Sequence, residues 1–261
     1  MRSRAVSFLA ASFLALACDP DPPRTGASRA AAPAAPSASA EPARAQALHL
    51  TAREGAATFL VDAPLEKIKG EARGLAGELA LDPEDLARTR GEIRVDLATL
   101  VTRTFEDPSR NEAQTDHARN WMEIGSGTPP AVRESNRFAR FVIEGVDLAG
   151  PHRLADLPAT SGVRAFEATV RGSLRVHGVA EPASGLVAIE VRGEPGASLL
   201  VRVTTRSPLF LSLKAHDVKP RDLAGRFLDG ALERAGGKID DRVQISVELT
   251  AGAVRGAAIL P

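Results

Sequence analysis

Hydrophobic and polar residues alternate along several stretches of the chain beyond about residue 48. The longest stretch, residues 166–177, has an apolar residue at nearly every second position. Residues 92–97 and 242–249 show the same period of two. This period places successive side chains on opposite faces, so each stretch predicts a strand with one buried face. Gly172, in the middle of the longest stretch, predicts a bend or a bulge in that strand.

Weaker alternation marks further strand candidates. One-sided strands in series are typical of an antiparallel sheet that closes into a barrel or folds into a sandwich. The sequence therefore predicts an all-β domain. The weaker candidates are residues 57–62, 68–81, 137–148, 186–192, 199–205 and 209–215.

Two segments with a helical period interrupt the strands. Ser109 and Glu112 resemble a capping box at the start of the first segment. The second segment, residues 223–235, has apolar residues at every fourth position and stops at Gly236. We expect these helices to plug or cover one end of a barrel rather than to form a separate domain. The apolar positions of the first segment are Ala113, Ala118, Trp121 and Met122.

The beginning of the chain is typical of an exported protein. Arg2 and Arg4 precede the uncharged residues 5–17, a stretch too short to span a bilayer but suited to a signal peptide. It ends at Cys18, the only cysteine, and residues 15–18 resemble a bacterial lipobox. The resemblance implies a diacylglyceryl group on Cys18, cleavage before it and a membrane anchor. The alternative is an ordinary secretory signal that leaves Cys18 as a free thiol.

The sequence thus divides into three regions. Residues 1–17 are the expected signal peptide, and residues 18–46 are the lipidated cysteine and a Pro-, Ala- and Ser-rich linker. Such a linker buries too little apolar surface to fold, so we expect a disordered tether. Residues 47–261 are the expected barrel domain. The expected location is the bacterial cell envelope, facing the periplasm, on either the inner or the outer membrane.

Composition and charge exclude some classes of protein. Lys and Arg together number 33, as do Asp and Glu, so the formal net charge is zero. A nucleic-acid-binding protein needs a surplus of cations to neutralise phosphates. Aromatic residues make up 4% of the chain and there is no tyrosine, so the sequence offers no platform for stacking bases. We expect no nucleic-acid partner.

Few residues suggest chemistry. His177 lies beside a glycine turn and is more typical of a strand end than of a ligand or base. The polar groups of the first helix and the pair His216-Asp217 lack the spacing of a metal site. No nucleophile motif or phosphate loop is present, so we expect no cofactor and no enzyme. A hydrolase would need an acid and a base brought together by the fold. The polar groups of the first helix are Asp107, Asp116, His117 and Glu123.

Several blocks of the chain resemble the YceI-like family. Residues 172–179, Gly-Ser-Leu-Arg-Val-His-Gly-Val, resemble the family's strand-and-turn pattern G-x-L-x-[IV]-H-G-V. Residues 91–97 are similar to its G-x-[IV]-x-[IV]-D-L block, and residues 241–249 resemble its closing strand. The resemblance covers about residues 55–251. It implies an extended, lipocalin-like antiparallel barrel of eight strands, here with one or two accessory helices, and a lumen that holds a long lipid such as a polyisoprenoid.

Apolar residues on the predicted inward faces are candidates for the wall of that lumen or, equally, for a packed core. We expect an envelope lipoprotein that binds a long apolar ligand for carriage or sequestration. The alternative is a structural or protein-interaction lipoprotein with a filled barrel and no small-molecule ligand. The candidates are Phe59, Val61, Ile93, Val95, Leu97, Phe141, Ile143, Phe166, Val170, Leu174, Val176, Val243, Ile245 and Val247.

Overall fold

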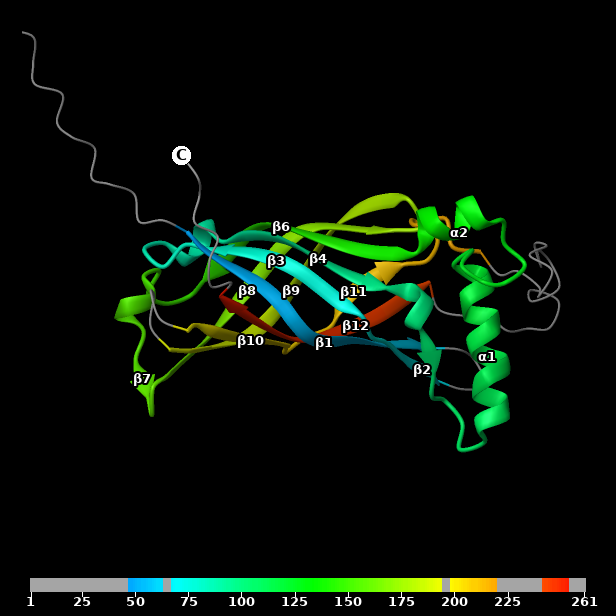
Figure 1. The fold of residues 1–261 in the computed structure, drawn as a ribbon, viewed down its shortest axis with the longest axis horizontal. Coiled ribbons are helices and arrows are strands. Elements are labelled where there is room, and N and C mark those ends of the chain that lie inside the picture. Colours follow the sequence, from blue (N-terminus) through cyan, green and yellow to red (C-terminus); the bar gives the residue numbers. More distant parts are fainter. Residues whose placement is uncertain (1–46, 63–66, 194–197, 220–240, 254–261) are drawn as a thin grey trace, which may run out of the picture. The chain divides into compact units, whose positions relative to one another are not determined.

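The structure is a computed structural model that describes residues 47–62, 67–193, 198–219 and 241–253 (Figure 1). The expected signal peptide, the lipidation site Cys18, the linker and the expected helix over residues 223–235 lie outside the described residues. No helix among the described residues is long and apolar enough to span a membrane.

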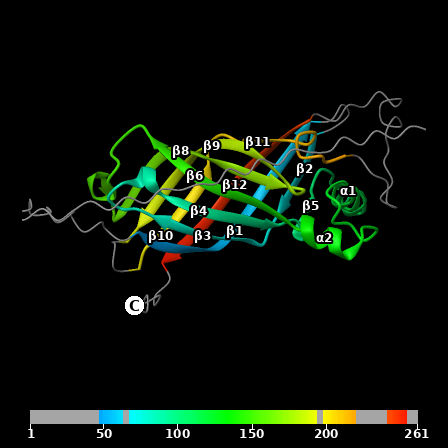
Figure 2. The same ribbon diagram turned by 90° about the horizontal axis from the view of Figure 1, so that it is seen from above.

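Eight antiparallel strands form a closed barrel, as the sequence predicts (Figures 1 and 2). The last strand pairs with the first over Leu50–Val61 and Val243–Ala253, which closes the sheet. Closure leaves these strands without a free edge. In order around the barrel, the strands are β1 (Leu48–Asp62), β3 (Leu75–Leu81), β4 (Arg90–Asp96), β6 (Phe138–Leu148), β8 (Val163–Val176), β9 (Val179–Arg192), β10 (Leu200–Thr205) and β12 (Arg242–Ala253).

Shorter strands extend the barrel at its ends. β2 (Lys67–Ala72) pairs with the second half of β1, and β5 (Val101–Thr102) pairs with β2. β11 (Leu209–Ser212) pairs with the first half of β12, and β7 (Ala159–Thr160) pairs with β8. Residues 68–81, expected as one strand, are therefore two. The chain turns between β2 and β3 at Gly74, whose φ of +69° suits glycine.

Two α-helices, α1 (Pro108–Trp121) and α2 (Pro130–Asn136), lie together at one end of the barrel (Figure 1). The predicted capping box at Ser109 is wrong. Asp107 is the N-cap residue, and its carboxylate accepts hydrogen bonds from the Ser109 backbone N (2.9 Å) and Oγ (2.8 Å). Pro108 occupies the first helical turn, where a missing N–H costs nothing. The sequence did not predict α2, which is too short to show a helical period.

The sequence predicts a bend or a bulge at Gly172 on β8, but the bulge lies on the neighbouring strand, β6. The pairing of β8 with β9 is continuous through Gly172, whereas β6 shifts register between Ile143 and Gly145. The extra residue, Glu144, therefore belongs to β6. A Cβ on Gly172 would lie 1.9 Å from the carbonyl oxygen of Val142, so glycine lets the two strands approach closely.

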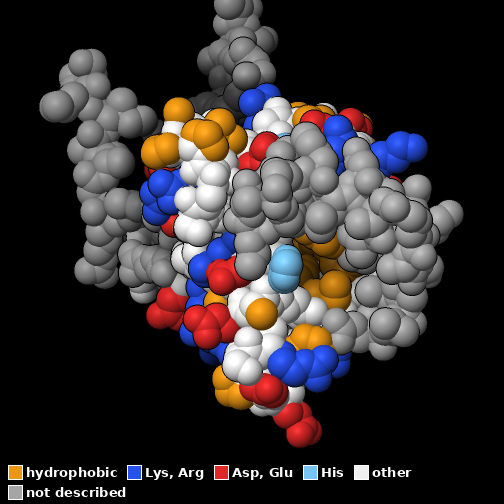
Figure 3. Space-filling view, turned by 90° about the vertical axis from the view of Figure 1, so that its right-hand side faces the viewer, with side chains coloured by type: hydrophobic (Ala, Val, Ile, Leu, Met, Phe, Trp, Pro, Cys, Tyr) orange, Lys and Arg blue, Asp and Glu red, His pale blue; other side chains and the backbone are white. Residues whose placement is uncertain are grey.

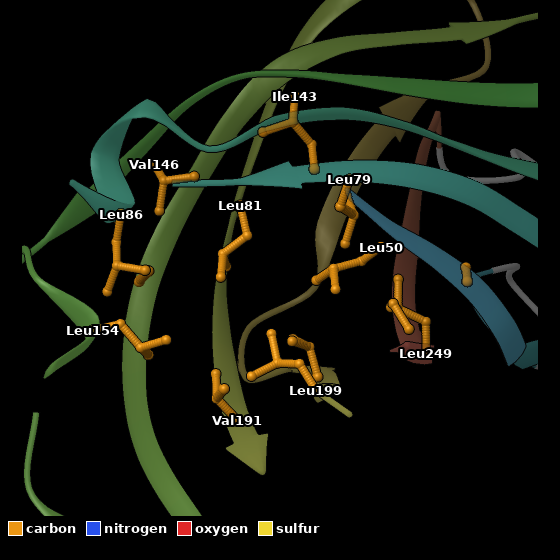
Figure 4. Close-up of a cluster of buried hydrophobic side chains, with 14 of the residues drawn as sticks. Leu50, Leu79, Leu81, Leu86, Ile143, Val146, Leu154, Val191, Leu199 and Leu249 are labelled. Carbon is orange, nitrogen blue, oxygen red and sulfur yellow. The ribbon is translucent and has the colours of Figure 1, made fainter. Parts of the chain in front are cut away.

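The barrel end away from the helices is packed with aliphatic side chains, which point toward one another in Figure 4. Two short 3-10 helices, η1 (Leu86–Arg88) and η3 (Leu154–Asp156), close this end, with Leu86 and Leu154 almost fully buried. The backbone N–H of Leu86 donates to His152 O and that of Leu154 to Pro83 O, both at 2.8 Å. A smaller buried cluster near α1 consists of Val61, Leu174, Val176, Leu211 and Val243.

Candidate ligand-binding site

The barrel encloses a cavity of about 420 Å³. Its wall is built from all eight barrel strands together with β2, β11 and α1, and almost all of it is apolar. Both the volume and the apolar lining are typical of sites that bind small molecules. Trp121 adds an indole N–H to the wall, and the other wall residues with polar side-chain atoms are Thr58, Thr89, Gln114, His117, Arg140 and Thr205.

The structure places every apolar residue proposed above for the lumen on the wall of this cavity. Apart from Leu97, which follows β4, they come together because alternation puts the apolar face of each strand on the inside of a closed sheet. Their contact with a ligand stays a prediction. The wall also contains Val187, Ile189, Val201 and Val203, which are absent from those candidates although the alternation in residues 186–192 and 199–205 is a signal for them.

One face of α1 forms the wall at the end of the barrel. Its wall residues follow the spacing of neighbours on one helix face. His117 is exposed and stands at the rim. Figure 3 shows this end of the molecule, where hydrophobic side chains are recessed beside a histidine. The wall residues of α1 and the position after it are Gln114, His117, Ala118, Trp121 and Met122.

Hydrogen bonds to β5 and its neighbour η2 (Leu97–Thr99) fix α1 in this position. The Thr102 backbone N–H donates to Thr115 Oγ1 (2.9 Å), and Thr102 Oγ1 donates to Asn111 O (2.8 Å). Arg119 donates from Nε to Leu100 O (3.2 Å) and from Nη2 to Ala98 O (3.1 Å). Thr102 and Thr115 are buried, so their bonds are shielded from water.

His177 stabilises a tight turn, as the sequence predicts. It joins β8 to β9 together with Gly178, and both residues have positive φ, 51° and 78°. This is the backbone form that a two-residue hairpin favours. The imidazole Nε2 lies 2.6 Å from Glu123 Oε2, and Nδ1 lies 3.2 Å from His216 O. His177 thus connects the hairpin to the segments that follow α1 and β11.

Residues 48–251 match the YceI-like domain. The chain belongs to the YceI-like family. A comparison with curated proteins gave no match.

Solved structures with a similar fold include three bacterial proteins. The polyisoprenoid binding domain from Saccharophagus degradans is 14% identical with a TM-score of 0.49, over 79% of this chain and 99% of that one. BcnA from Burkholderia cenocepacia is 17% identical with a TM-score of 0.43, over 75% and 95%. The YceI protein of Campylobacter jejuni is 10% identical with a TM-score of 0.40, over 71% and 85%.

Several of the candidate metal ligands of this YceI-like protein have other contacts. Asp107 caps α1, and Glu123 contacts His177. His216 is buried, with Nδ1 2.8 Å from Ser212 O and Nε2 3.3 Å from Leu174 O. Within the described part of the chain, no three His, Cys, Asp or Glu side chains gather closely enough to hold a metal ion.

A charge pair links neighbouring strands of the YceI-like barrel near the helices. Asp96, at the end of β4, accepts hydrogen bonds from Arg137 Nε (3.1 Å to each oxygen) and from Nη2 (2.7 Å). The Arg137 guanidinium holds the pKa of Asp96 below its usual range, and the Ala98 backbone N–H adds to the effect against the opposing effect of burial. This pair ties β4 to the start of β6.

Proposed function

We propose that this YceI-like barrel binds one long apolar molecule, a polyisoprenoid or a similar lipid, and carries or sequesters it. The observation that supports the proposal is the apolar cavity of about 420 Å³. Apolar side chains would replace water around the ligand, which stabilises the complex by roughly 25 cal/mol per Å² buried. Each methylene contributes about 0.8 kcal/mol before the cost of ordering the chain. The proposed mechanism is passive and has no catalytic step.

The cavity favours this function over the alternative of a filled barrel with a protein partner. A filled barrel would bring the inward side chains into contact across its axis, as at the end closed by Leu86 and Leu154. The Saccharophagus degradans domain is described as polyisoprenoid binding. Support for this chain comes from its own cavity, independently of that likeness.

The proposed place of action is the bacterial envelope. The basic start, the uncharged residues 5–17 and the lipobox-like residues 15–18 support export and lipidation at Cys18. The Pro- and Ala-rich residues 19–46 would then tether the barrel to the membrane, where long apolar lipids reside.

The chain contains a built-in reporter for this function. Trp121 is the only tryptophan, it lines the cavity, and the chain has no tyrosine. Titration with phytol, a long branched isoprenoid alcohol, should therefore change the tryptophan emission until a single site is saturated. A folded protein whose emission does not respond to phytol, and that retains no phytol on gel filtration, would contradict the proposal.

The same Val→Phe exchange at two positions, one inside the barrel and one outside it, tests where the ligand binds. Val170→Phe places a larger side chain on the cavity wall, whereas Val142→Phe places it on the outer face of β6, where Val142 is 41% exposed. We expect Val170→Phe to weaken phytol binding by about tenfold or more, because it fills the lumen. We expect Val142→Phe to bind as the unchanged protein does. Equal affinities of the two variants would place the ligand outside the barrel.

A further inference from the structure

The indole N–H of Trp121 is a hydrogen-bond donor without an acceptor among the described residues. Its Nε1 is buried and has no hydrogen-bond partner within the described ranges, and the side chain lines the cavity. Buried polar groups in folded proteins almost always have a partner, and the N–H of a buried tryptophan usually finds one. A donor of this kind on a cavity wall is a candidate contact for a ligand.

The position of Trp121 predicts how a ligand would be oriented in the cavity. It lies in the last turn of α1, about two turns after Gln114 on the same helix face. The polar wall residues Gln114, His117 and Trp121 thus gather on one helix at one end of the cavity, while the barrel strands contribute an apolar wall apart from a few threonines and Arg140. A ligand with one polar end fits this division if its polar end lies against α1.

One other polar atom of the wall, Thr89 Oγ1, is buried without a described hydrogen-bond partner. Thr89 follows η1 at the start of β4, and the opposite end of β4 leads to the carbonyls that Arg119 of α1 binds. Thr89 therefore marks the other end of the cavity. A hydroxyl rotates and both donates and accepts, whereas an indole N–H only donates in a direction that its ring fixes.

The described wall indicates the charge of the polar end. Its only Lys or Arg residue is Arg140, whose Nη1 lies 3.5 Å from Glu92 Oε1, and both side chains are nearly half exposed. His117 stands on the exposed rim. A phosphate drawn into the cavity would need buried cations for compensation, whereas a neutral oxygen needs only a donor.

We propose that Trp121 donates a hydrogen bond to a neutral oxygen acceptor, such as an ester, amide or quinone carbonyl, at the end of the apolar ligand. This inference rests on the proposed function. The ligand would lie with its polar end under α1 and its chain directed toward Leu86 and Thr89.

Two probes with the same branched carbon skeleton test the assignment: phytyl acetate, which has a carbonyl, and phytane, the saturated hydrocarbon, which has no oxygen. The full chain, labelled with ¹⁵N, gives one indole N–H signal because Trp121 is the only tryptophan. We expect phytyl acetate to shift the resonance of the indole N–H proton downfield. Phytane should not cause this shift. In competition binding, phytyl acetate should bind about three- to tenfold more tightly than phytane.

Variants separate the hydrogen bond from the loss of ring volume. Trp121→Phe should remove the preference for the acetate while still binding phytane, and the matched variant Thr89→Val should keep the preference. A preference that survives Trp121→Phe, or that disappears in Thr89→Val, would overturn the assignment. Tighter binding of phytyl phosphate than of the acetate would also overturn it.

The outcome for phytane separates this inference from the proposed function. Equal binding of phytane and phytyl acetate, with the indole signal unshifted by the acetate, would refute the role of Trp121 and leave the apolar binding site intact. Binding of neither probe to the folded chain would refute both.

Discussion

His177 and Glu123 are joined by a 2.6 Å contact between Nε2 and Oε2, and the other ring nitrogen of His177 lies 3.2 Å from His216 O. The β8–β9 hairpin, the segment after α1 and the segment after β11 therefore meet at one imidazole. The side chain of His177 is only 7% exposed, so both contacts are largely shielded from water. This histidine holds together the barrel end over which α1 lies.

Replacing His177 by Asn should destabilise the fold. Asparagine tolerates positive φ, so the turn is preserved while the contact with Glu123 is removed. We expect the free energy of unfolding to fall by about 1–3 kcal/mol in urea denaturation. His152→Asn is the matched control, because His152 is 55% exposed and its contact with Asp85 is 3.3 Å long. A loss no larger than that of His152→Asn would contradict the structural role of His177.

Gly172→Ala should destabilise the barrel where β6 and β8 meet. The added Cβ would lie 1.9 Å from the Val142 carbonyl oxygen, a backbone atom that cannot rotate away. We expect a loss of about 3 kcal/mol, measured by thermal or urea unfolding. In Gly150→Ala the new Cβ meets nothing within 4 Å, so this control should change stability by no more than about 0.5 kcal/mol. If the two variants had similar stabilities, β6 and β8 would not approach each other as closely at Gly172 as the structure shows.

The Asp96–Arg137 pair predicts a loss of stability in acid. The folded state lowers the pKa of Asp96, so its contribution is fully present above the unfolded value of about 3.9. It declines as the pH falls below that value and is gone below the lower, folded-state pKa. We expect Asp96→Asn to be less stable than the unchanged protein at pH 7 and to lose less stability between pH 5 and pH 2.

Glu92→Gln is the control for this pH dependence. Glu92 pairs with Arg140 at the surface, where both side chains are nearly half exposed, and such pairs contribute little. Its acid unfolding should follow that of the unchanged protein. If Asp96→Asn shows the same acid unfolding as Glu92→Gln, then Asp96 does not contribute to acid stability in the way that we describe.

Cys18→Ser should release the protein from the membrane. The chain has one cysteine, so a clickable palmitate analogue fed to expressing bacteria should label the unchanged protein and leave the variant unlabelled. Fractionation of the envelope should move the barrel from the membrane to the soluble fraction. An unlabelled, soluble protein without the substitution would favour an ordinary secretory signal.

Alternation of apolar and polar residues was enough to predict most of the strands, because an antiparallel sheet over a core buries one face of each strand. It left a barrel and a sandwich both open, and the closed eight-stranded barrel was implied by the resemblance to the YceI-like family. Alternation also identified wall residues on five strands, β1, β4, β6, β8 and β12. It would have failed at Val146, which lines the cavity although simple alternation from Ile143 points it outward. The bulge at Glu144 reverses the alternation along β6. Next to it, β6 approaches β8 closely at Val142, which requires Gly172 on β8.

Only part of the helical contribution to the site was predictable from the sequence. The sequence predicts that the helix covers one end of the barrel, and it identifies Trp121 and Met122 as apolar positions, but it does not show how the helix is oriented over the cavity. Its position depends on Thr102, Thr115 and Arg119, whose hydrogen bonds join segments that no local pattern connects. The same reason explains why Trp121 was not among the residues proposed for the lumen.

The most direct measurement of the central claim is native mass spectrometry of the full chain purified from a bacterial envelope, followed by solvent extraction. We expect a reproducible additional mass that matches one long apolar molecule, which is recovered in the extract. The Val170→Trp variant, with its lumen filled, should be folded and lack this mass. A protein that carries no additional mass, and that stays unchanged after incubation with polyprenyl lipids, would contradict a ligand-binding barrel.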